Sequence, residues 1–101
     1  MATTRKNIEK FAKMIYKETG IEVKKSYQSN YGGWCCFVFK ELFSKDMIAL
    51  GTFIEKHFKI EGYSVERCCT LKSMDGFLML DIHKFRLDDF MKNGKITDIG
   101  Y

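Results

Sequence analysis

The 101-residue sequence contains no proline, and none of its apolar runs is long. No stretch approaches the roughly 20 apolar residues of a membrane span, so we expect no membrane partner. The first 18 residues interleave charged and apolar side chains and lack the apolar segment of about 7 to 15 residues that secretion signals require. We therefore expect a cytoplasmic protein whose four cysteines stay reduced, because disulfides rarely persist in the cytosol.

Alanine and arginine are also scarce, whereas lysine, phenylalanine, isoleucine and methionine are abundant. This bias is expected when codons come from an AT-rich genome, and it favours a low-GC bacterium or one of its phages as the source. With 46% hydrophobic and 15% aromatic residues, the chain is too rich in core-forming side chains to be disordered. Its length predicts a single domain over residues 1–101 that folds alone.

Two helix-strand-strand units follow from the spacing of apolar residues. In the first unit, residues 4–40, apolar residues three and four positions apart predict an amphipathic helix over 4–18, which Gly20 ends. These apolar residues are Ile8, Phe11, Ala12, Ile15 and Tyr16. Alternation predicts a strand over 21–28, and a turn leads to residues 34–39, which are apolar at every position. Such a strand is typical of the centre of a sheet.

The second unit covers residues 44–83. Ser44 is the predicted N-cap, and Gly62 the predicted end, of a helix with a wide apolar face. That face comprises Met47, Ile48, Leu50, Phe53, Ile54 and Phe58. Residues 63–71 and 77–83 are predicted to pair as a hairpin across an Asp-Gly dipeptide, which suits tight turns.

After the second unit the pattern weakens, and Leu87, Phe90 and Met91 predict one short helix in the C-terminal segment 85–101. The predicted fold class is α+β, a two-layer αββαββ arrangement with an antiparallel sheet and a short C-terminal helix. A shift of 42 residues superimposes several apolar positions of the two units, Phe11 on Phe53 among them. A duplicated helix-strand-strand unit is therefore a hypothesis.

The segment Phe11-Ala12-Lys13-Met14-Ile15-Tyr16-Lys17-Glu18-Thr19-Gly20, together with the αββαββ order, resembles the arrangement of the LAGLIDADG homing endonucleases. It departs from the family's pattern at Lys13, where that family uses a small residue for close helix packing. It departs again at Thr19, which separates the acidic residue from the glycine. The resemblance implies a shared order of elements, and no catalytic residue is assigned from it.

The cysteines occur as two adjacent pairs, at positions 35–36 and 68–69. Four thiolates can bind zinc, but the C-x₂-C spacing of zinc loops is absent. Neighbouring residues of a strand point to opposite faces, so each pair is predicted to split across the sheet. We predict structural thiols, with no metal and no other cofactor.

Asp81 and His83 lie two residues apart on a predicted strand and share a face. They could orient an imidazole as a general base if a thiol such as Cys36 or Cys69 lay opposite. Strand ends commonly carry polar groups, so a structural role is the alternative. His57 is interpreted as a residue at the boundary of the apolar face of its helix.

The excess positive charge is confined to the N-terminal quarter. Residues 1–25 hold seven basic and three acidic residues, which accounts for the whole net charge of +4. On a helix of about 100° per residue, four lysines form a stripe opposite the apolar face that no acidic residue interrupts. This basic ridge comprises Lys6, Lys10, Lys13 and Lys17, and Lys24 and Lys25 complete the predicted binding set. A solvated helix face is the alternative to an anionic partner.

A second candidate surface is the sheet face that points away from the helices. If the even-numbered residues of 77–83 face the helices, Phe77 and Met79 face the other way. Half of strand 34–39 joins them, and Trp34 belongs to this predicted apolar binding face. Large exposed apolar patches are uncommon on monomers. We expect a cover, which is the C-terminal segment, the second subunit of a homodimer, or a target protein.

These features favour a small non-enzymatic binding or regulatory protein of a phage or another mobile element. Its predicted role is to inhibit or modulate a macromolecular partner, as anti-defence proteins do, through the basic ridge and the apolar sheet face. The expected partner is an acidic protein surface or a nucleic acid, and no small-molecule substrate is expected. Two alternatives stay open. One is a plain nucleic-acid-binding module, which interleaved basic and aromatic residues on one sheet face would favour; Lys24, Lys25, Tyr27 and Tyr31 are scattered examples of them. The other is a small enzyme that uses cysteine or histidine.

Overall fold

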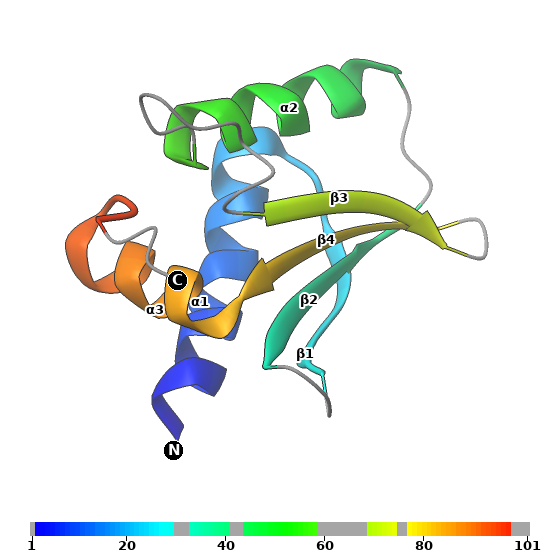
Figure 1. Cartoon of the computed structure of the whole chain (residues 1–101). Coiled ribbons are helices and arrows are strands. Elements are labelled where there is room, and N and C mark those ends of the chain that lie inside the picture. Colours follow the sequence, from blue (N-terminus) through cyan, green and yellow to red (C-terminus); the bar gives the residue numbers. More distant parts are fainter. Residues whose placement is uncertain (1, 30–32, 41–43, 59–68, 75–76, 98–101) are drawn as a thin grey trace.

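A computed structural model describes residues 2–29, 33–40, 44–58, 69–74 and 77–97 (Figure 1). In chain order the elements are α1 (Ala2–Thr19), β1 (Val23–Gln28), β2 (Trp34–Phe39), α2 (Ser44–Phe58), β3 (Cys69–Met74), β4 (Phe77–His83) and α3 (Lys84–Asn93). The predicted α+β fold with its αββαββ order and C-terminal helix is confirmed. The predicted strand residues 63–68, the helix end at Gly62 and the turn at 75–76 lie outside the described residues.

The four strands form one antiparallel sheet in the order β1-β2-β4-β3. The central place predicted for β2 is confirmed, since β1 pairs with one of its edges and β4 with the other. Each unit thus contributes its second strand to the centre of the sheet and its first strand to an edge. Two units related by a two-fold axis would give this order, but the duplication itself stays a hypothesis.

The register of the strands decides which residues share a face, because residues directly opposite each other in antiparallel strands lie on the same side. On the side of the helices, β2 and β4 pair Cys35 with Ile82, Phe37 with Leu80 and Phe39 with Leu78. On the other side, which we call the open face, they pair Trp34 with His83, Cys36 with Asp81 and Val38 with Met79. The predicted split of the Cys35-Cys36 pair across the sheet is confirmed.

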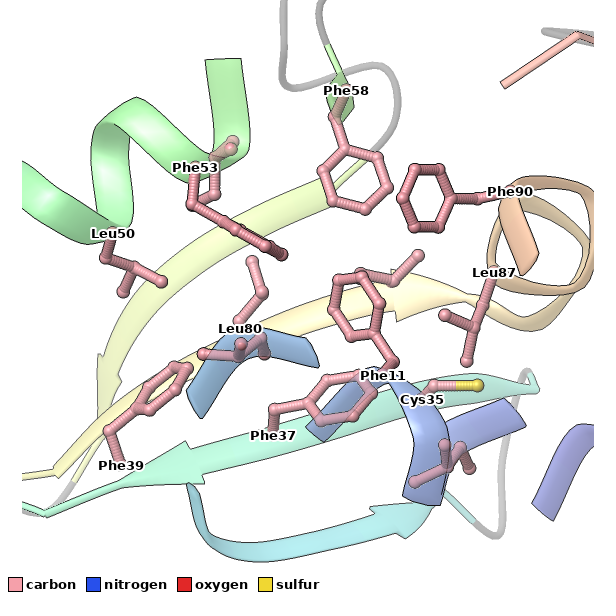
Figure 2. Close-up of a cluster of buried hydrophobic side chains, with 14 of the residues drawn as sticks. Phe11, Cys35, Phe37, Phe39, Leu50, Phe53, Phe58, Leu80, Leu87 and Phe90 are labelled. Atoms are coloured by element: carbon pink, nitrogen blue, oxygen red, sulfur yellow. The ribbon is translucent and has the colours of Figure 1, made fainter. Parts of the chain in front are cut away.

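The three helices lie on the same side of the sheet (Figure 1). Their apolar side chains form one core with the helix-facing residues of β2 and β4, and Phe11 of α1 lies in the middle of the labelled rings (Figure 2). Leu87 and Phe90 of α3 belong to this core and are 0% and 3% exposed. The suggestion that they cover the open face is therefore wrong: they fill the space beside α1 on the opposite side of the sheet.

The exposed apolar residues of the helices correct two predicted faces. Tyr16 is 59% exposed, because it directly follows the buried Ile15 and a helix rotates about 100° per residue. On α2, Met47 and Ile48 are 40% and 71% exposed. Only the stripe of Leu50, Phe53, Ile54 and Phe58 is buried. Ile48 points away from that stripe, and Met47 lies in the first turn, ahead of it.

The end predicted for the first helix at Gly20 is confirmed. Gly20 has a φ of 76°, the left-handed region that favours glycine, and its N–H donates to the carbonyl of Tyr16 at 2.8 Å. The hydroxyl of Thr19 donates to the carbonyl of Ile15 at 2.6 Å. The bond from Gly20 satisfies a carbonyl group that the last helical turn would leave unpaired. None of the three described helices is both long and apolar enough to cross a bilayer.

Candidate functional site

Aromatic side chains gather on the open face of the sheet. In the described part of the chain five large aromatic side chains are exposed, and four of them lie on this face or at its end. They are Tyr27 (36% exposed), Trp34 (38%), Phe77 (38%) and Phe85 (65%), and the fifth is Tyr16 on α1. Met79, which belongs to the predicted apolar binding face, is only 8% exposed. The accessible part of this face is therefore mainly aromatic.

Lysine side chains lie against three of these rings. The Nζ of Lys24 is 4.1 Å from the ring centroid of Phe77, and the Nζ of Lys25 is 5.2 Å from that of Tyr27. Lys84 holds its Nζ 5.2 Å from the ring of Phe85. Each distance is within the range of a cation–π contact, worth about 0.5–1 kcal/mol at an exposed site. We call this surface the aromatic–lysine platform: Lys24, Lys25, Tyr27, Trp34, Phe77, His83, Lys84 and Phe85.

A β-bulge brings two consecutive lysines to the platform. Strict alternation would send Lys24 and Lys25 to opposite faces of β1. The register between β1 and β2 shifts between Val23 and Lys25, which leaves Lys24 as the extra residue. Lys25 then pairs with Val38 on the open face, and Lys24 reaches Phe77 on the same face. The bulge thus doubles the positive charge at this edge.

Gly33 makes room for the third lysine. Its φ is 67°, and a Cβ added there would lie 3.2 Å from both Cδ and Cε of Lys84. The carbonyl of Gly33 accepts a hydrogen bond from the N–H of Lys84 at 2.9 Å. The turn before β2 and the start of α3 therefore meet at this glycine, and Lys84 lies beside Phe85 as a result.

Three of the residues considered for catalysis, Cys36, Asp81 and His83, fall on the open face. Cys36 lies directly opposite Asp81, whereas Cys69 pairs with Ile82 and so occupies a position on the helix face. The Nδ1 of His83 accepts a hydrogen bond of 3.3 Å from the backbone N–H of Phe85. His83 is the N-cap of α3, so its imidazole has a structural role. The ring of Trp34 meets it edge-on at 5.4 Å between centroids.

The basic ridge lies on a different surface. Lys6, Lys10, Lys13 and Lys17 are all exposed, on the side of α1 opposite its buried Ile8, Phe11 and Ile15. Since that buried side faces the sheet, the ridge points away from the platform. The structure therefore divides the predicted binding set: four lysines stay together on α1, and Lys24 and Lys25 join the aromatic rings of the open face.

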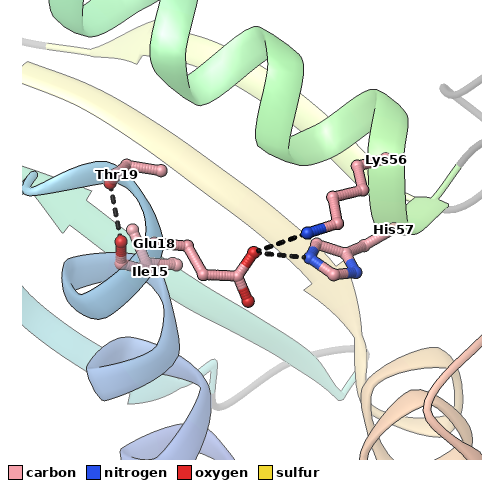
Figure 3. A network of polar contacts seen from close by, with 5 residues as sticks. All are labelled: Ile15, Glu18, Thr19, Lys56 and His57. Atoms are coloured by element: carbon pink, nitrogen blue, oxygen red, sulfur yellow. Dashed lines mark hydrogen bonds and ion pairs between the residues drawn. The ribbon is translucent and has the colours of Figure 1, made fainter.

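Glu18 and His57 join the ends of α1 and α2 (Figure 3). An oxygen of the Glu18 carboxylate is 2.9 Å from the Nε2 of His57 and 3.5 Å from the Nζ of Lys56. The hydrogen bond with His57 lowers the pKa of Glu18 from its ordinary 4.5, with the charge of His57 and Lys56 acting in the same direction and desolvation opposing it. The imidazole of His57 packs against Phe53 and Phe90, so its predicted boundary position is confirmed.

We expect Glu18→Gln to lower the free energy of unfolding by about 0.5–1 kcal/mol at about pH 5, the usual size for a partly exposed pair. The folded-state pKa of Glu18 is lowered, so its contribution is present above pH 4.5 and is lost as the pH falls through that pKa. The difference from wild type should thus be smaller at about pH 3 than at about pH 5. Urea unfolding at both pH values measures it, with the exposed Glu55→Gln on α2 as the control. A difference that persists unchanged at about pH 3 would contradict the assignment.

Cys35 is a buried core residue with an unreactive thiol. Burial raises its pKa from 9.0 to about 12, and the nearby charge of Asp88 acts in the same direction. At neutral pH this side chain is the protonated thiol, a weak nucleophile and a poor metal ligand. Among the residues that the structure describes, no group of three histidine, cysteine or acidic side chains is arranged to hold a metal ion.

Comparisons of the chain with protein-family models, with curated proteins and with solved structures give no match. The resemblance to homing endonucleases therefore rests on the order of the elements and on the segment 11–20. Sequence patterns selected Trp34, Phe77, Lys24 and Lys25, but they assigned the two lysines to the basic ridge. They missed Phe85 and Lys84, which follow the last strand and reach the platform only because α3 starts there.

Proposed function

We propose that this protein binds single-stranded nucleic acid on the open face of its sheet. The observation that supports the proposal most directly is the aromatic–lysine platform, in which Lys24, Lys25 and Lys84 each lie beside an exposed ring. Proteins that bind single strands combine aromatic rings, on which bases stack, with positive side chains that hold the phosphates. The platform offers both within one surface.

The charge of the open face supports an anionic partner. In the described strands, Asp81 is the sole acidic residue that the register places on this face, and it is buried. Three of the exposed rings each have a lysine ammonium beside them, so they do not form a purely apolar patch. The cores of protein–protein interfaces are depleted of lysine, so this mixture favours a nucleic acid over an acidic protein surface.

Trp34 provides the test, because it is the single tryptophan of the chain and belongs to the platform. We expect twelve-residue oligothymidylate to quench its fluorescence saturably. For about three phosphate contacts, a fourfold rise in salt should weaken binding roughly twentyfold, and a duplex of equal length should bind less tightly because its bases cannot stack on the rings. Phe85→Ala should weaken binding about five- to 150-fold.

The control for Phe85→Ala is Ile48→Ala, which also removes an exposed apolar side chain but lies on α2. It should leave the affinity for the oligonucleotide unchanged. If the duplex binds more tightly than the single strand, or if Phe85→Ala and Ile48→Ala behave alike, the platform is not a stacking surface and the proposal fails.

The broader hypothesis is that the protein acts in the cytoplasm as a regulator or inhibitor encoded by a phage or another mobile element. Binding of single-stranded nucleic acid would give such a protein a means of reaching its target. The alternative of a small cysteine or histidine enzyme has one supporting contact, Cys36 opposite Asp81, but the hydrogen bond that His83 accepts engages the imidazole at the start of α3. The role as a regulator and the alternative of an enzyme both stay predictions, as does the homodimer.

A further inference from the structure

A groove lies between α1 and β1 at the edge of the sheet. Its volume is about 320 Å³, near the lower end of the sizes found for small-ligand pockets. The residues that line it are Arg5, Ile8, Glu9, Ser26, Tyr27 and Gln28. Ile8 is buried and supplies an apolar floor, while the charged and amide side chains stand at the rim. The groove therefore suits a small ligand with an apolar surface and polar groups at its edge.

The polar side chains of the groove are not used by the fold. Among the described residues, no hydrogen bond or ion pair involves the side chains of Arg5, Glu9 or Gln28. Their neighbours differ, because Thr4 and Asn7 both donate to Asp88 of α3, at 3.0 Å and 2.9 Å. In the first turns of α1, Thr4 and Asn7 thus attach the helix to α3. The polar side chains that face the groove can therefore bind a ligand.

The groove and the platform share Tyr27. This residue lies on β1, an edge strand, and its ring is 5.2 Å from the Nζ of Lys25 on the open face. It also lines the groove between α1 and β1. A single-stranded nucleic acid that lies on the platform can therefore pass over this edge and place one base between Tyr27 and α1.

From these side chains we infer that the groove binds a guanine base of the strand held on the platform, an inference that rests on the proposed function. Guanine presents two acceptors, O6 and N7, which match the paired N–H groups of an arginine. Its N1–H and N2 amino donors match a carboxylate. Arg5 and Glu9 are four residues apart, so they project from the same side of α1. Adenine carries an amino group where guanine has O6 and would meet Arg5 with a donor.

The test compares eleven-residue oligothymidylates that carry one central guanine, adenine, cytosine or hypoxanthine, with Trp34 fluorescence as the readout. Guanine should bind about five- to hundredfold more tightly than adenine, the usual discrimination of a bidentate arginine contact. Arg5→Gln should remove most of that preference. Glu9→Gln should weaken binding of the guanine strand more than binding of the hypoxanthine strand, because hypoxanthine keeps N1–H but has no N2 amino group.

Two substitutions with the same charge changes serve as controls on α2, Lys45→Gln for Arg5→Gln and Glu55→Gln for Glu9→Gln. Both should leave the preference for guanine intact. If all four strands quench Trp34 with equal affinity, the guanine site is disproved while the proposed strand binding stands. If no strand binds, guanosine monophosphate alone decides: it should shift the NMR signals of residues 5–9 and 26–28 where adenosine monophosphate does not, and equal effects of both would overturn the inference.

Discussion

Replacing Phe11 with alanine is expected to lower the free energy of unfolding by about 3–5 kcal/mol, the usual cost of removing a buried phenylalanine. The ring of Phe11 is fully buried and contacts rings from three other elements, β2, α2 and α3. Its centroid lies 5.1 Å from that of Phe37 on β2, 5.7 Å from that of Phe53 on α2 and 5.8 Å from that of Phe90 on α3. No neighbouring side chain can fill the space without leaving its own contacts, so a cavity remains.

Urea unfolding monitored by circular dichroism measures this loss. A domain of this size has a total stability of about 5–15 kcal/mol, so Phe11→Ala removes a large fraction of it. Tyr16→Ala on the same helix is the control, because Tyr16 is 59% exposed and its removal should cost less than about 1 kcal/mol. If the two variants lose similar stability, Phe11 is not the centre of the core.

Reversing the charge of Lys24 and Lys25 together should weaken single-strand binding by about thirtyfold or more at low salt. Both lysines stand beside rings of the platform, so their ammonium groups are in place to meet the phosphates of a stacked strand. Losing two phosphate contacts should also reduce the slope of log affinity against log salt by about 1.4. Titration of the Trp34 fluorescence at several salt concentrations gives both quantities.

The basic ridge supplies a matched control with the same change of charge. Lys10→Glu with Lys13→Glu alters α1 on the side that faces away from the platform. Because the two surfaces lie on opposite sides of the two-layer fold, a Debye length of about 10 Å in 0.1 M salt screens one from the other. At 0.1 M salt we expect less than a threefold change in affinity for the nucleic acid strand. If the ridge variant lost much of its affinity and the platform variant little, the binding site would lie on α1.

Much of the fold follows from local patterns in the sequence. The 3.6-residue period of α1 and the continuous apolar run of β2 depend on near neighbours in the chain, so they can be read without knowing the partners of either element. The alternation of β4 also predicted which of its residues face the helices, since a strand has a period of two. Tyr16 and Ile48 mark the limit of such patterns, because apolar character does not show how much of a helix its neighbours cover.

The candidate site depended on contacts between distant parts of the chain. The strand order places β2 next to β4, and Lys24 meets Phe77 only because of that order and of the bulge in β1. A bulge is an irregularity of pairing between two strands, and the alternation of one strand contains no sign of it. Sequence patterns therefore joined Lys24 to the lysines of α1, which are closer in the chain.

The sequence by itself determined the α+β class, the order of the elements, the two faces of β4 and the existence of the basic ridge. Each of these depends on a periodicity within one segment. Only the tertiary structure decided that α3 packs beside α1 in the core, that the opposite side of the sheet is rich in aromatic rings and lysines, and that α1 and β1 leave a groove beside it. Those features depend on strand order, register and helix placement, which the packing of the whole core fixes at once.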